Sequence, residues 1–202
     1  SIMTTLFQNL NRDKQMKLML ALVLACTLAA CGSQEIAAKQ EAAPQQETAP
    51  QQAAICAEPM GISVEKLLLN IDAGLKGIGA PSTVQSKNIE ENECGYQIVM
   101  MTDFGAIQVG TNPQQEVLRL STATQLNSDL SNLFATIQTI TAIDGTEKMG
   151  QTEIGNLLVK TIGDMAPEVK QSGNASKDFE YKGKYYSIMI EGNNLVMLVR
   201  KI

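Results

Sequence analysis

The chain contains no histidine in its 202 residues. Histidine has the side-chain pKa best suited to proton transfer near neutral pH, and it is also the most common metal ligand in proteins. Its absence argues against most hydrolase mechanisms and most zinc sites. The four cysteines do not restore a zinc site, because none of them forms a CxxC pair. We therefore expect no catalytic residue, no metal and no cofactor.

Tryptophan is also absent, and only four phenylalanines and four tyrosines are present. Ten methionines accompany this shortage of aromatic side chains. Thioether sulfur is a good ligand for Cu(I), but methionine also fills irregular gaps in hydrophobic cores. We interpret seven of them as core residues: Met60, Met100, Met101, Met149, Met165, Met189 and Met197.

One catalytic spacing needs a closer look. Ser63 and Lys66 match the S-x-x-K pattern of serine acyl enzymes. The companion motifs are missing, because Ser128-Asp129-Leu130 lacks the asparagine and Lys160-Thr161-Ile162 lacks the glycine. Ser63 is therefore interpreted as the N-cap of a helix. An enzyme built from this chain would have to use carboxylates, such as Asp103, Glu116 or Asp144.

A short apolar run lies near the start of the sequence. Residues 18–30 follow Lys17 and are too few to span a membrane, which takes about 20 residues. A positive residue, a short apolar stretch and small residues at a cleavage point are the parts of a secretory signal. The run ends in Leu28-Ala29-Ala30-Cys31, which resembles the lipobox of bacterial lipoproteins. Met16 is the expected start of this signal, and Met3 is the alternative.

The lipobox resemblance implies a location. It implies cleavage of residues 1–30, a lipid on Cys31 that includes palmitate-type chains, and a membrane anchor. Gly32, rather than aspartate, follows the cysteine, which favours the outer membrane of the cell envelope, with the protein facing the periplasm. Each buried methylene contributes about 0.8 kcal/mol, so three acyl chains should anchor the protein almost permanently.

Cleavage at this point also changes the charge. It removes three basic residues and one acidic residue, which leaves 13 basic and 20 acidic residues and a net charge near −7. Such an acidic protein is a poor candidate for binding nucleic acid, and a better one for binding a basic or neutral partner.

Residues 31–54 predict a disordered tether. After Cys31 they are rich in Gln, Ala, Glu and Pro, contain no aromatic residue, and repeat the unit Ala-Pro-Gln-Gln. Such a composition cannot bury enough apolar surface to fold. Residues 55–202 are then left as one domain of ordinary size.

Two cysteines remain in this domain. Cys56 and Cys94 would lie in a compartment that oxidises thiols, and two thiols allow only one pairing. We expect a disulfide between them, with a pair of free or metal-binding thiols as the alternative.

Apolar periodicity predicts the elements of the domain. A helix is expected after Ser63, a hairpin over residues 96–109, a strand over 116–122, a helix over about 130–140 capped by Asn127 or Ser128, and a helix from about Thr152. Three closing strands are expected at 179–181, 185–190 and 195–199. The fold class is α+β: a two-layer antiparallel sheet with helices on one face. A shift of 89 residues aligns seven identical residues, so the chain could contain a duplicated helix–hairpin unit.

The segment from Phe179 to Tyr186 is the densest aromatic stretch and is locally basic. Tyrosine beside cations is enriched at recognition surfaces. It is the expected partner-binding patch, formed by Phe179, Tyr181, Lys182, Lys184, Tyr185 and Tyr186. The alternative is a strand pair whose tyrosines merely cover the sheet. By the period-two rule, Ile188 and Ile190 should point inward.

These observations predict a non-enzymatic envelope lipoprotein that binds a protein partner, as an inhibitor, an immunity factor or an assembly accessory. The alternatives are a carboxylate-based envelope enzyme and a structural lipoprotein that links the membrane to the cell wall.

Overall fold

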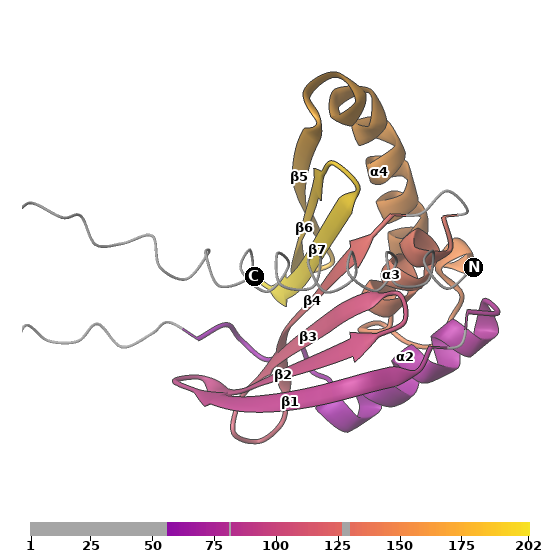
Figure 1. Cartoon of the computed structure of the whole chain (residues 1–202). Coiled ribbons are helices and arrows are strands. Elements are labelled where there is room, and N and C mark those ends of the chain that lie inside the picture. Colours follow the sequence, from indigo (N-terminus) through magenta and orange to yellow (C-terminus); the bar gives the residue numbers. More distant parts are fainter. Residues whose placement is uncertain (1–55, 81, 127–129) are drawn as a thin grey trace, which may run out of the picture. The chain divides into compact units, whose positions relative to one another are not determined.

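The computed structural model describes residues 56–80, 82–126 and 130–202. The predictions for the signal segment, for Cys31 and for the tether lie outside the described residues. Within them, the chain folds as α+β (Figure 1). The helices are α2 (Val64–Gly77), α3 (Ser131–Thr141), the short 3-10 helix η1 (Met149–Gln151) and α4 (Glu153–Ser172). The strands are β1 (Val84–Asn92), β2 (Gly95–Thr102), β3 (Gly105–Thr111), β4 (Val117–Gln125), β5 (Asn174–Tyr181), β6 (Lys184–Glu191) and β7 (Asn194–Lys201).

All seven strands form one antiparallel sheet in the order β1-β2-β3-β4-β7-β6-β5. The helices lie on one face of this sheet (Figure 1), as the sequence predicts. A single core forms between the two layers, with buried side chains from α2, α3, α4 and every strand except β1. The other side of the sheet, called the outer face below, has no helix over it in the described part of the chain.

Helix α2 begins where the sequence predicts. Ser63 is its N-cap, and its hydroxyl accepts a hydrogen bond from the backbone N–H of Lys66 at 3.2 Å. The S-x-x-K spacing is thus a helix start. Leu67, Ile71 and Leu75 lie one turn apart on the buried face of α2.

Helix α3 lies over the residues that the sequence predicts. It begins at Ser131, and its N-cap is Leu130, which has φ 59° and makes no side-chain capping bond. The predicted cap at Asn127 or Ser128 lies outside the described residues. The buried side chains of Leu133 and Ile137 pack the helix against the core.

A buried glutamine on α3 holds the loop that leads to α4. The side chain of Gln138 donates to the carbonyl of Glu147 at 3.0 Å and accepts from the N–H of Met149 at 2.8 Å. Gly74 of α2 leaves room for it, since a Cβ there would lie 2.5 Å from its amide nitrogen. These bonds fix residues 142–152, which form one wall of a hollow described below.

The element bounds repeat at the 89-residue shift, because α2, β1, β2 and β3 fall on α4, β5, β6 and β7. Their faces do not repeat: Met100 is 3% exposed, whereas its counterpart Met189 is 45% exposed. The two strand triplets share direction, run outward from β4 in opposite order and keep their helices on one face. A twofold rotation parallel to the strands superimposes the triplets with the faces of the sheet exchanged, but it would place the two helices on opposite faces. The duplicated unit therefore stays a prediction.

Candidate functional site

The structure divides the segment from Phe179 to Tyr186 between the two faces of the sheet. Successive residues of a strand point to opposite faces. Phe179 and Tyr186 point inward and stack with ring centroids 5.2 Å apart. Tyr186 is only 1% exposed, and burial raises the pKa of its phenol. Its assignment to a partner-binding patch is wrong, because a buried ring cannot contact a partner.

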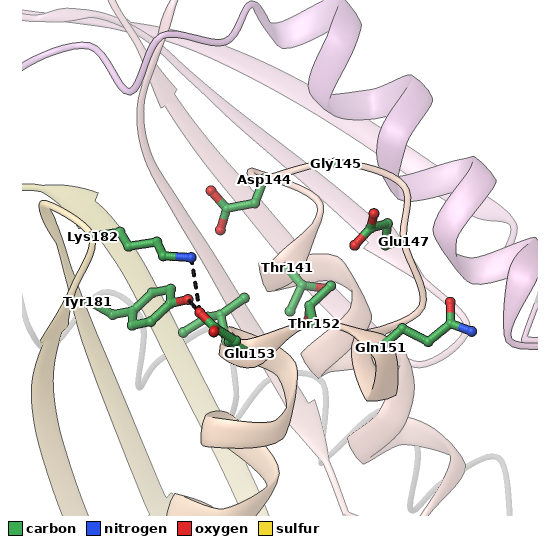
Figure 2. Close-up of a pocket in the computed structure, with 10 residues that line it drawn as sticks. Thr141, Asp144, Gly145, Glu147, Gln151, Thr152, Glu153, Tyr181 and Lys182 are labelled. Carbon is green, nitrogen blue, oxygen red and sulfur yellow. Dashed lines mark hydrogen bonds and ion pairs between the residues drawn. The ribbon is translucent and has the colours of Figure 1, made fainter.

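The turn of the same hairpin is tied to the helix layer. Tyr181 donates to Glu153 at 2.5 Å, and Lys182 forms an ion pair with the same carboxylate oxygen at 3.0 Å (Figure 2). Lys184 pairs with Asp144 at 2.6 Å. Three of the expected contact residues thus already have partners inside the domain.

Figure 2 shows the hollow beside this turn. It has a volume of about 390 Å³ and lies between the loop after α3, the start of α4 and the β5–β6 turn. Its charged lining consists of Asp144, Glu147, Glu153 and Lys182. Hydrogen bonds from Tyr181 and Lys182 lower the pKa of Glu153, and the bonds with Tyr181 and Glu153 raise the pKa of Lys182. At neutral pH Glu153 is therefore ionised and has no proton to donate as a general acid.

The structure places the three carboxylates that the sequence offers for catalysis in three different parts of the fold. Asp103 lies in the turn between β2 and β3, where it accepts a hydrogen bond from Ser82. Glu116 lies at the opposite end of β3, bonded to Asn112. Asp144 lies after α3, paired with Lys184. Residues 56–80, 82–126 and 130–202 contain no cluster of three or more metal-ligating side chains of the His, Cys, Asp and Glu types.

The expected cysteine pair is present. The Sγ atoms of Cys56 and Cys94 are bonded at 2.02 Å, with the two Cα atoms 5.5 Å apart. Cys94 lies in the turn between β1 and β2, and its N–H donates to the side chain of Asn92 at 2.9 Å. The bond therefore attaches the first described residue to one end of the sheet.

The outer face is the surface that sequence reasoning missed. One register row crosses five strands of it and contains only apolar side chains. We call it the outer apolar row: Met101, Ala106, Ala123, Val196 and Met189. Ser86 continues the row on β1 and Ser176 continues it on β5. The strand periodicity shows which residues point outward, but only the register shows that these five are neighbours.

Comparison with known proteins adds no relative. No family model matches the chain, and no curated protein or solved structure matches it either. No helix in the described ranges is long and apolar enough to cross a membrane. The function is therefore argued from the residues of this chain.

Proposed function

We propose that this chain is a lipid-anchored protein of the bacterial cell envelope whose folded part binds a protein partner through its outer face. The sequence Leu28-Ala29-Ala30-Cys31 supports the anchor, and Gly32 supports the outer membrane. The partner-binding role is non-enzymatic, of the inhibitor, immunity or assembly-accessory kind.

The observation that carries the binding role is the outer apolar row. A sheet with one face on the core normally has polar side chains on the other face. Here a row near one end of that face is apolar over five adjacent strands, and contiguous apolar surface marks interaction sites. Two small alanines lie between two exposed methionines. Methionine adapts its shape to a partner, which suits a contact surface.

The test of this role uses an affinity-tagged chain and solubilised envelope. Met189→Glu places a charge in the row, and we expect it to reduce capture of a stoichiometric partner by about tenfold or more, because the charge must be desolvated on binding. The matched control is Val159→Glu, since Val159 lies on α4, in the other layer, and is 40% exposed. Mass spectrometry and band intensity report the captured partner.

Two results would contradict this role. One is a partner that the Met189→Glu chain retains as well as the unaltered chain does. The other is recovery of cell-wall fragments with no protein, which would favour the structural lipoprotein that links membrane and wall. Circular dichroism of both variants checks that the fold is intact.

The anchor is tested separately. Cells grown with labelled palmitate should incorporate the label into the chain, and Cys31→Ser should abolish incorporation and move the protein from the membrane fraction to the soluble fraction. Cys26→Ser, in the same segment, should leave both unchanged. Absence of label in the unaltered chain would show that the lipobox interpretation is wrong.

A further inference from the structure

Strand β1 is a free edge of the sheet (Figure 1). Its nine residues, Val84–Asn92, are all exposed, and in the described part of the chain it pairs with β2 alone. The backbone N–H and C=O groups on the free side of such a strand can pair with a further strand, so proteins usually protect a long edge. β1 contains no proline, and its one register shift lies near its start, between Val84 and Ser86. Residues 86–92 therefore form a regular edge that is open to another strand.

The register with β2 shows which backbone groups lie on the free side of β1. The β1–β2 turn has a two-residue loop, so Asn92 and Gly95 form the hydrogen-bonded pair that closes it. Antiparallel strands alternate hydrogen-bonded and non-hydrogen-bonded pairs. Counting back from Asn92, the N–H and C=O groups of Lys87, Ile89 and Glu91 point away from β2. These three residues would supply the backbone bonds to an added strand.

The side chains of the same three residues lie on the helix side of the sheet. Lys87 and Ile89 lie opposite Met100 and Ile98, whose side chains are buried in the core. Ile89 itself is 55% exposed, because it lies beyond the helices. Lys87 and Glu91 take part in none of the ion pairs found among the described residues. They cannot pair with each other, since four residues of strand separate them by about 13 Å.

Two copies of β1 are complementary when they pair about a twofold axis at Ile89. An axis that makes two neighbouring strands antiparallel is perpendicular to the sheet, so each side chain faces one on its own side of the sheet. Pairing about Ile89 sets Lys87 of each copy opposite Glu91 of the other, and sets Ile89 opposite itself. An axis at Lys87, Glu90 or Glu91 sets like charges opposite each other. An axis at Asn88 sets Lys87 opposite Ile89, without an ion pair.

The other edge strand, β5, lacks this complementarity. Its one basic residue, Lys177, points to the opposite side of the sheet from Asp178 and Glu180. No twofold pairing of two β5 strands can set Lys177 opposite an acidic residue of the second copy. Of the two edges, β1 is thus the one whose charges match a copy of itself.

We propose that β1 pairs with β1 of a second copy of this chain and joins the two sheets into one. Lys87, Ile89 and Glu91 of each copy would each exchange two backbone hydrogen bonds with the residue opposite. The ion pairs between Lys87 and Glu91 determine the register. The helices of both copies lie on the same side of the joined sheet, and the two outer apolar rows share the other side. The dimer does not depend on the proposed protein partner, because it uses the edge of the sheet and not the outer face.

Sedimentation equilibrium of the full chain in density-matched detergent measures this association. We expect a monomer–dimer equilibrium that Lys87→Glu and Glu91→Lys each weaken by about tenfold, because each change sets like charges opposite each other twice. The double variant Lys87→Glu/Glu91→Lys should restore dimerisation, since opposite charges face each other again. The matched control is Glu90→Lys, the same charge change on the outer face of β1. It should change dimerisation by less than about twofold, because residue 90 lies opposite the neutral Asn88.

A second set of variants tests the position of the axis. Ile89→Lys and Ile89→Glu should each dimerise weakly alone, whereas a mixture of the two should form a heterodimer, because the opposite charges meet at the axis. The exposure of these positions predicts an intact fold, which circular dichroism of each variant checks.

Four results would overturn the proposal. They are a chain that stays monomeric, single charge variants that dimerise as tightly as the unaltered chain, a double variant as weak as the single ones, and a mixture of Ile89 variants that forms no heterodimer. A monomeric chain would leave the edge to a segment outside the described residues or to a strand of another protein.

Discussion

Replacing Cys56 and Cys94 together by serine should lower the free energy of unfolding by about 4 kcal/mol. The disulfide closes a segment with a sequence separation of 38 residues. In the chain-entropy model, opening a loop of this length raises the entropy of the unfolded chain. The unfolded state is thereby stabilised by about 4 kcal/mol. Urea denaturation of the reduced, oxidised and double-serine chains measures the difference.

The reduced chain is the internal control for this prediction. It should unfold at the same urea concentration as the double-serine chain, because both lack the bond. Equal midpoints for the oxidised and reduced chains would contradict the prediction.

Tyr186→Ala should cost about 3–5 kcal/mol of stability, which is the usual loss for a large buried aromatic side chain. Tyr186 is buried and stacks on Phe179, so truncation removes apolar contacts and leaves a cavity in the core. The adjacent residue provides the matched control. Tyr185 lies on the outer face, and Tyr185→Ala should change stability by under about 1 kcal/mol.

Chemical denaturation with fluorescence or circular dichroism distinguishes the two tyrosine variants. The expected result is a large shift of the midpoint for Tyr186→Ala and a small one for Tyr185→Ala. Similar losses in both variants would mean that the hairpin is stabilised equally by its two faces, against the observed burial.

The sequence predicts the positions of the helices and strands that bury one face in the core. Helices α2 and α4 have apolar residues one turn apart and a Ser or Thr cap, and both start where the pattern predicts. Strands β2, β3, β6 and β7 are short apolar runs bounded by turn residues, so their positions are also predicted. Local chemistry and burial agree in these segments.

Strand β1 was missed because it has no such signal. All nine of its residues are exposed, since it lies at the edge of the sheet beyond the helices. An edge strand pairs through its backbone on one side and can carry polar side chains such as Lys87 and Glu90 throughout. Only its pairing with β2 makes it a strand.

The partner-binding patch was a different kind of error, because the signal to correct it was available. Tyr186, Ile188 and Ile190 are separated by two residues each, so an inward Ile188 requires an inward Tyr186. Composition suggested a surface where periodicity already indicated a core. The outer apolar row, in contrast, depends on register between strands that are distant in sequence, and no local pattern determines that register.

The disulfide also determines where mechanical load would enter the domain. Residues 60–64 are joined to the start of β4 by three backbone hydrogen bonds, from Met60 to Val117, from Val64 to Gln115 and from Val117 to Ile62. If the cysteines were reduced, tension applied through the chain before Cys56 would pull on the Glu58–Lys201 ion pair and then on these bonds. With Cys56 bonded to Cys94, the force passes instead to the β1–β2 turn. In its oxidised form the disulfide thus protects residues 57–64 from a force applied through the chain before Cys56.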